Sequence, residues 1–248
     1  MTNQLDTHNN RYAFIDWLRG FSIALMVIYH FCYDLDLFGY IDTAFGKNYW
    51  IPFRYVIVIG FLSLVGVSLV LVHAEKIRWA SMRKRSIQLL LASIIVSVSS
   101  YFVDARQVTL FGILQLILVA SWLALPFVKF YRLAFVLGAA IFILGHWVKS
   151  PMFEPLWIHW VGMVETQRPA LDYVPLFPWL GMVLMGITLG HWFFHTERGR
   201  NFASIEVGKV KGLGKISWLL EKAGQHSLVI YLVHQPLMFG TLYVISQL

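Results

Sequence analysis

Seven long apolar segments dominate the sequence and constrain what the chain can fold into. A helix needs about 20 mostly apolar residues, with a range of about 17–25, to cross the hydrocarbon core of a bilayer. The segments are residues 14–38, 53–73, 87–103, 110–128, 133–148, 174–194 and 227–245. They predict an all-α polytopic membrane protein of about seven transmembrane helices, in which residues 1–248 form a single transmembrane domain.

The composition supports a membrane protein. Of the 248 residues, 58% are hydrophobic and 13% are charged, whereas soluble proteins carry about 25% charged residues. The net charge of +7 would raise the question of nucleic acid in a soluble protein, but here the basic residues lie between apolar segments. We therefore expect membrane lipids as partners and no nucleic acid. Cys32 is the only cysteine, which excludes an intrachain disulfide and a cysteine-based zinc site, and no metal is expected.

Basic residues predict the orientation, because Lys and Arg are in excess in cytoplasmic loops. Only five lie on one side: Lys47, Arg54, Arg106, Lys149 and Arg168. The other side carries Arg11, Lys76, Arg78, Arg83, Lys84, Arg85, Lys129, Arg132, Arg198, Arg200, Lys209, Lys211, Lys215 and Lys222. We expect a cytoplasmic N-terminus and an external C-terminus, and a span count wrong by one would destroy this separation.

The first apolar segment carries an unusual set of ionisable groups. With 100° per residue, Asp16, Arg19, His30, Tyr33 and Asp34 fall on one stripe about 100° wide, and it rises about 27 Å from Asp16 to Asp34. Polar groups are costly in lipid and commonly mark a pathway or a reaction site. Asp16 and Arg19 could instead simply pair near the interface. That alternative does not account for His30, about 16 Å deeper than Arg19.

The first segment and three later blocks resemble a known family. Arg19 and His30 are separated by ten residues, which resembles the signature of the transmembrane acyltransferase superfamily. The fuller pattern runs from Arg11 through IDWLRG and MVIYH to Asp34, and it resembles the bacterial branch of the heparan-α-glucosaminide N-acetyltransferase family. The blocks FGILQ, PLFPWLG and HSLVIYLVHQP agree with this resemblance.

This resemblance implies an enzyme that transfers an acetyl group from cytosolic acetyl-CoA to an acceptor on the far side of the membrane. Animal members acetylate the terminal glucosamine of heparan sulfate in the lysosome. The present chain is much shorter and lacks their large lumenal domain, so heparan does not carry over as its acceptor. We expect a bacterial cytoplasmic membrane and an amino-sugar or glycan acceptor.

Acyl transfer needs a base or nucleophile, and His30 suits either role, with Asp34 one turn away to fix its tautomer. Arg19 with Asp16, and Arg83 with Arg85, are candidates for binding CoA. The second pair could equally be an ordinary positive-inside cluster that contacts lipid. The candidates for the acceptor pocket are Asp36, Arg54, Gln115 and His234, beneath an interfacial segment at residues 157–160. A salt bridge that ties the first two spans together is the alternative for Asp34, Asp36 and Arg54.

Other readings of the sequence stay open. A proton-coupled transporter could use the Asp/His stripe as a relay, and a non-catalytic scaffold would use its polar groups for shape alone. Gly186 and Gly190 have the spacing of close helix packing. His191 and His195 could bind metal at their spacing of four, although an interface position is the better interpretation. Residues 195–225 are predicted to form a linker with one short surface helix.

Overall fold

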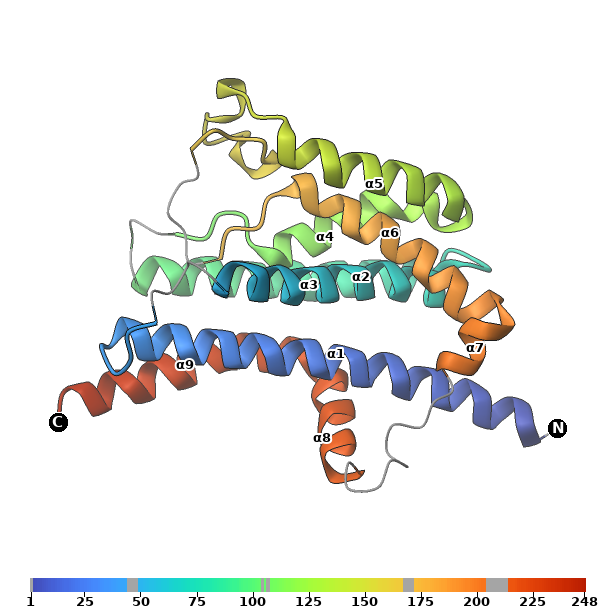
Figure 1. Ribbon diagram of the computed structural model, residues 1–248, viewed down its shortest axis with the longest axis horizontal. Coiled ribbons are helices and arrows are strands. Elements are labelled where there is room, and N and C mark those ends of the chain that lie inside the picture. The colour runs from blue at the N-terminus through green and yellow to red at the C-terminus, as the bar shows by residue number, and fades with distance from the viewer. Residues whose placement is uncertain (1, 44–48, 104, 106–107, 167–171, 204–213) are drawn as a thin grey trace. The chain divides into compact units, whose positions relative to one another are not determined.

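The computed structural model describes residues 2–43, 49–103, 105, 108–166, 172–203 and 214–248, with side chains from residue 13 onward. All seven predicted segments are helical. The helices are α1 (Thr2–Leu37), α2 (Trp50–His73), α3 (Trp79–Val103), α4 (Ile113–Ala124), α5 (Tyr131–Trp147), α6 (Leu176–His195), α7 (Glu197–Ala203), α8 (Gly214–Gln225) and α9 (Ser227–Ser246) (Figure 1). Short 3-10 helices at Leu125–Lys129, Pro151–Phe153 and His159–Val161 complete the described elements.

Among the described residues, five helices are long and apolar enough to cross a membrane by length and composition. They are Ala13–Leu37 within α1, Trp50–His73, Trp79–Phe102, Leu176–His195 and Ser227–Ser246. The predicted fourth and fifth spans correspond to the shorter apolar helices Ile113–Lys129 and Tyr131–Trp147. The all-helical, multi-pass architecture is thus confirmed, while the number of seven spans and the orientation stay predictions.

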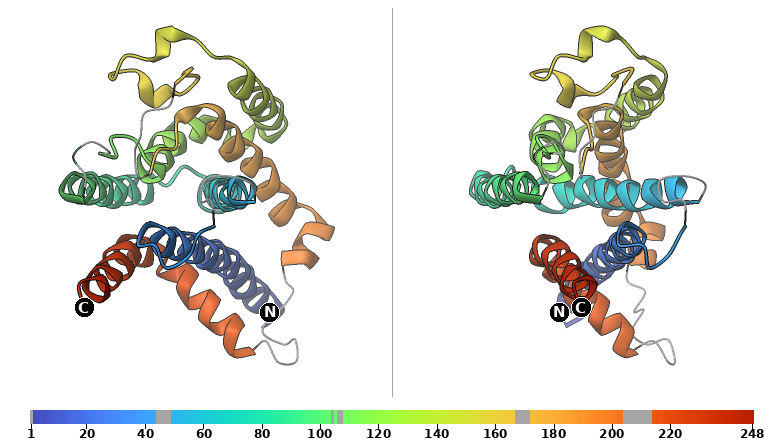
Figure 2. Two further views of the ribbon diagram at one scale, coloured as in Figure 1. Left: turned by 60° about the vertical axis from the view of Figure 1, so that its left-hand side comes forward. Right: turned by 90° about the vertical axis from the view of Figure 1, so that its left-hand side faces the viewer.

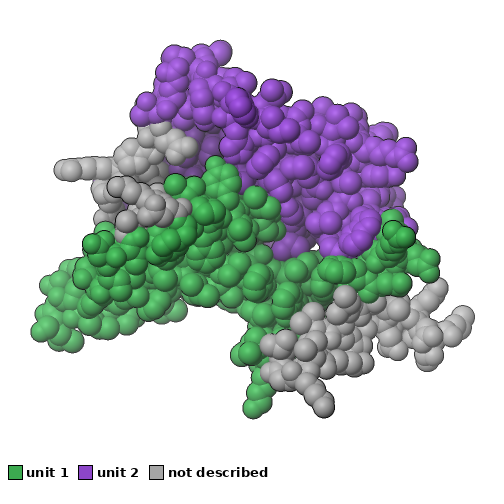
Figure 3. Space-filling model, in the orientation of Figure 1, with its two compact units in different colours: residues 1–61, 196–248 green, residues 62–195 purple. Residues whose placement is uncertain are grey.

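The chain divides into two compact units, which are coloured separately in Figure 3. The chain passes from the first to the second inside α2, and it returns between α6 and α7. The first unit comprises residues 1–61 and 196–248, so the two ends of the chain fold together. The second unit comprises residues 62–195. Each unit has its own set of close helix contacts.

In the first unit, α1 and α9 lie side by side and run in the same direction (Figures 1 and 2). The contacts between them follow one register, because His30 meets His234 and, further along, Phe38 meets Phe239 at a ring separation of 5.2 Å. A buried cluster of Ile23, Met26 and Ile57 packs α1 against the first half of α2, and Ile230 and Tyr231 of α9 pack against the same cluster. The first and last apolar segments of the chain are therefore neighbours.

Helix α8 packs against the middle of α1 and runs across its axis (Figure 1). The contact is made by backbone on both sides: a side chain at Gly20 would clash with the carbonyl of Leu220, and one at Gly224 would clash with the carbonyl of Asp16. The sequence predicted a linker with one short surface helix here, whereas the described part of this region holds two helices. Helix α8 has an exposed face, as a surface helix does, and its other face is closely packed on α1 because glycines remove the side chains that would keep the two backbones apart.

Glycines also bring the helices of the second unit together. A side chain at Gly186 in α6 would meet the carbonyl of Ser63 in α2, and one at Gly190 would meet Val70. Gly138 of α5 and Gly181 of α6 each face the other's carbonyl oxygen. Small residues at such crossings allow the close backbone approach on which helix association in lipid depends. The predicted packing role of Gly186 and Gly190 is confirmed.

Replacing Gly20 by alanine should destabilise the protein. The added methyl group has no room against the Leu220 carbonyl, and overpacking of this kind costs about 1–3 kcal/mol. Gly240→Ala in α9 is the matched control, because its methyl group enters open space and alanine is the better helix former. Thermal unfolding in detergent should show a lower Tm for Gly20→Ala only. Equal stability of the two variants would contradict the tight α1–α8 contact.

Candidate functional site

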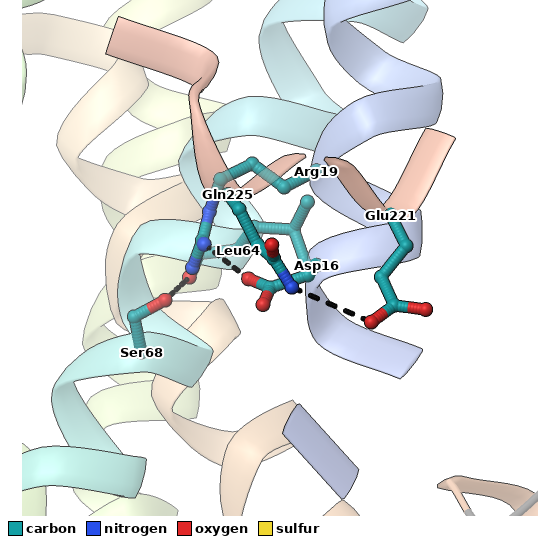
Figure 4. A network of polar contacts seen from close by, with 6 residues as sticks. All are labelled: Asp16, Arg19, Leu64, Ser68, Glu221 and Gln225. Carbon is teal, nitrogen blue, oxygen red and sulfur yellow. Dashed lines mark hydrogen bonds and ion pairs between the residues drawn. The ribbon is translucent and has the colours of Figure 1, made fainter. Parts of the chain in front are cut away.

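Three levels of α1 carry the polar stripe, and the first lies at the N-terminal end of its apolar part. There Arg19 Nη1 donates a hydrogen bond to Asp16 Oδ1 at 2.7 Å, within one turn of the helix. Both side chains are largely buried, with 26% of Arg19 and 20% of Asp16 exposed. The Gln225 side chain at the end of α8 lies beside this pair (Figure 4). Asp16 and Arg19 therefore form the ion pair that the alternative interpretation of the sequence predicted.

At the second level, the His30 ring of α1 faces the His234 ring of α9, with ring centroids 5.1 Å apart. His234 is buried, and its Nδ1 lies 2.7 Å from the carbonyl oxygen of Tyr231. A carbonyl oxygen can only accept a hydrogen bond, so Nδ1 must carry the hydrogen. In the neutral ring, Nε2 of His234 therefore holds the lone pair and is the basic nitrogen.

The third level lies one turn beyond His30, where Asp34 is fully buried. Its Oδ1 accepts a hydrogen bond from Gln235 Nε2 at 2.8 Å, and within the described residues its Oδ2 has no hydrogen-bond partner. The carboxylate predicted to orient His30 thus interacts with α9 instead. Asp34 is related to His30 by position, because the two residues lie one turn apart on the same face of α1.

The two remaining polar groups of this unit differ in their surroundings. Asp36 Oδ1 accepts hydrogen bonds from the backbone N–H and the hydroxyl of Thr43, at 2.9 and 3.0 Å. Trp50 Nε1 in turn donates to the carbonyl of Thr43 at 3.2 Å, so Asp36 organises the connection from α1 to α2. Arg54 is exposed on the first turn of α2 and lies within electrostatic range of His30.

Arg83, Arg85 and Gln115 belong to the second unit. Both arginines are exposed near the start of α3. Gln115 Oε1 accepts from the backbone N–H of Gly112 at 3.0 Å, and its Nε2 donates to Ser97 Oγ at 3.2 Å. Its amide therefore caps α4 and links that helix to α3, a structural use of a residue predicted to bind the acceptor.

The segment that contains Trp157 is ordered by hydrogen bonds between its own residues. Tyr173 donates its hydroxyl hydrogen to the His159 carbonyl at 2.7 Å, and Trp160 Nε1 donates to the Trp157 carbonyl at 3.0 Å. Burial, together with the nearby Glu154 carboxylate, raises the pKa of Tyr173 to about 12, so the phenol stays neutral and remains a donor. Trp157 itself is exposed, as expected of an interfacial tryptophan.

The histidine pair on α6 has a structural role. His191 Nε2 lies 2.6 Å from the carbonyl oxygen of Val128, and its ring stacks on His195 with centroids 4.8 Å apart. Among the described residues, no group of three or more His, Cys, Asp or Glu side chains could hold a metal ion. This hydrogen bond joins His191 of α6 to the 3-10 helix Leu125–Lys129, and the predicted interface position of the two histidines stays a prediction.

The structure thus brings His30, Asp34 and His234 together from opposite ends of the chain, and it adds two residues that the sequence did not single out. Gln235 binds Asp34, and the Tyr231 carbonyl fixes the tautomer of His234. Gln235 is a polar side chain inside an apolar helix, and this signal could have been read from the sequence. The contribution of Tyr231 could not have been read, because it comes from the backbone.

A helical membrane chain with a histidine pair in contact between its first and last apolar helices has the form of a polytopic membrane protein with an internal polar site. The family model described as heparan-alpha-glucosaminide N-acetyltransferase, catalytic, matches residues 11–236, nearly the whole chain. The chain belongs to this family, which makes the protein a membrane N-acetyltransferase by family. The resemblance to the family is confirmed, and its assignment to the bacterial branch stays a prediction. Among curated proteins and among solved structures, none matched.

Gln235→Leu should destabilise the protein by about 1–3 kcal/mol, because it removes the hydrogen-bond donor from a buried carboxyl group. In the double variant Asp34→Leu/Gln235→Leu, neither partner remains to be left unsatisfied. Its loss of stability should therefore be smaller than the sum of the two single losses. Unfolding of all three variants in detergent measures this coupling. Strictly additive losses would contradict a stabilising Asp34–Gln235 contact.

Proposed function

We propose that this protein transfers an acetyl group from cytosolic acetyl-CoA to an acceptor on the extracytoplasmic side of a bacterial cytoplasmic membrane, with His30 as its base or acyl-accepting nucleophile. The observation that carries this proposal is the contact between His30 and His234, at 5.1 Å between ring centroids. Two imidazoles in contact within an apolar helix pair supply basic nitrogens where the surrounding lipid supplies none. The family match supports the reaction class.

The chemistry requires movement of one acetyl group and one proton. Transfer to an amine forms a C–N bond, breaks the C–S bond of the thioester, removes a proton from the amine and gives a proton to the CoA thiolate. As a base, His30 takes the proton from the attacking amine and passes it to the thiolate. As a nucleophile, its ring nitrogen first takes the acetyl group from the thioester, CoA leaves as the thiolate, and the thiolate takes the proton that the acylated ring loses. The amine then attacks acetyl-His30, its proton passes to the ring, and neutral His30 is the leaving group.

His234 assists His30 in either route. Its Nδ1–H is held by the Tyr231 carbonyl, so the basic Nε2 is the nitrogen that can exchange a proton. Asp34 and Gln235, one turn further along, hold the two helices in register at the histidines. We therefore treat His30 as the reacting group, His234 as its proton partner, and Asp34 with Gln235 as positioning residues.

The donor is proposed to bind on the cytoplasmic side. CoA carries several phosphate charges, and guanidinium groups bind phosphates in a bidentate manner. Arg19, with its charge partly offset by Asp16, is assigned to the thioester end of the donor. Arg83 and Arg85, exposed on α3, are assigned to the phosphates.

The acceptor is proposed to approach from the other end of α1. Arg54 is the strongest candidate to contact it, because this residue is exposed and acts electrostatically on His30. Asp36 and Gln115 are weaker candidates, since both already hold backbone groups in place. An amino sugar or a glycan fits the reaction class of the family.

His30→Asn should lower acetyl transfer by about 10²–10⁴-fold, because asparagine keeps polarity but has no basic nitrogen. The measurement is transfer of labelled acetyl from acetyl-CoA in proteoliposomes, with CoA binding and thermal unfolding as folding checks. His226→Asn, at an exposed position just before α9, is the matched control and should retain activity. An active His30→Asn protein would refute the catalytic assignment. Labelled acetyl that stays on the wild-type chain without acceptor would identify His30 as the nucleophile.

Arg83→Gln/Arg85→Gln should weaken CoA binding by roughly tenfold or more, because hydrogen bonds to charged groups contribute about 1.5–3 kcal/mol. Isothermal titration with CoA measures the Kd. The control variant, Lys76→Gln/Lys129→Gln, removes the same charge at two exposed positions outside α3. If both double variants bind CoA as wild type does, the arginines belong to an ordinary positive-inside cluster. Absence of CoA binding by the wild type would favour the transporter alternative.

A further inference from the structure

The outward face of α8 combines apolar and basic side chains. Ser217 and Gly224 are buried on the side that packs against α1. On the other sides Trp218, Leu219 and Ile216 are exposed at 58%, 57% and 53%. Lys215 and Lys222 lie close to Trp218 and Leu219 around the helix, at intervals of three and four residues. A water-exposed helix would not present large apolar side chains in this density.

The position of α8 along α1 coincides with the end of a membrane span. The apolar part of α1 begins at Ala13, and α8 contacts α1 through Gly20 and Asp16. The ionic Asp16–Arg19 pair marks the same level. Helix α8 leaves this point across the axis of α1 (Figure 1). A helix that runs across a membrane-spanning helix at this level lies roughly parallel to the membrane surface.

We propose that α8 is an interfacial helix that binds anionic phospholipid. Trp218, Leu219 and Ile216 enter the boundary between headgroups and acyl chains, where tryptophan is favoured. Lys215 and Lys222 extend their ammonium groups to lipid phosphates, and each basic residue near an anionic surface contributes to binding. The placement in the cytoplasmic leaflet rests on the orientation given under the proposed function, whereas the lipid contact itself does not.

Quenching of a fluorophore on α8 tests this proposal. Cys32 is first replaced by serine, and bimane is attached at Leu219→Cys in full-length protein reconstituted into nanodiscs of phosphatidylcholine and phosphatidylglycerol. Brominated lipids quench a fluorophore that lies in the bilayer, and iodide quenches one that lies in water. We expect strong quenching by brominated lipid and weak quenching by iodide. Bimane at Ser217→Cys, on the buried side, should be protected from both quenchers.

The lipid preference is measured by brominating one lipid at a time. Phosphatidylglycerol should be enriched around position 219 by roughly fivefold or more, given the contribution expected of each lysine. Lys215→Gln/Lys222→Gln should abolish this enrichment, while Lys76→Gln/Lys129→Gln should retain it. Iodide quenching at position 219 equal to that of free dye would overturn the proposal, as would protection from both quenchers. Equal quenching by both lipids would overturn the anionic preference. Acetyl transfer is assayed separately, so its absence does not decide this test.

Discussion

Most of the first unit follows from one constraint, which is that polar side chains in a membrane-spanning helix must find protein partners because lipid offers none. The stripe on α1 meets this constraint at each level in a different way. Asp16 forms an ion pair with Arg19 of its own helix, His30 contacts the ring of His234, and Asp34 accepts a hydrogen bond from Gln235. Two of these three solutions need α9. The last apolar segment of the chain therefore lies against the first one.

Backbone proximity is the second requirement, and glycine supplies it. Gly20 and Gly224 let α8 contact α1 beside the Asp16–Arg19 pair, and Gly66 and Gly186 do the same for α2 and α6 in the second unit. Because apolar side chains gain little from leaving lipid for another helix, such contacts depend on dispersion and on weak polar interactions at short range. A site built between helices of this kind keeps its geometry only while these glycines remain small.

The same reasoning connects the fold to the proposed chemistry. A neutral imidazole ring is the form that accepts a proton or an acetyl group. The Tyr231 carbonyl orients His234, so the tautomer is selected by the backbone of α9. The positions of Asp34 and Gln235 along their helices then keep the two histidines opposite each other.

The sequence by itself determined the helical class, the helical segments, the polar stripe on α1 and the family, because apolar length, helical periodicity and motif spacing are local properties. It also identified His30, Asp34 and His234 as residues of interest. Only the tertiary structure decided which of them meet. It paired Asp34 with Gln235, used Gln115 as a helix cap, and packed α8 closely across α1. These outcomes depend on contacts between residues up to about two hundred positions apart in the sequence. Helical periodicity describes only neighbouring turns of one helix, so it does not predict which distant residues meet.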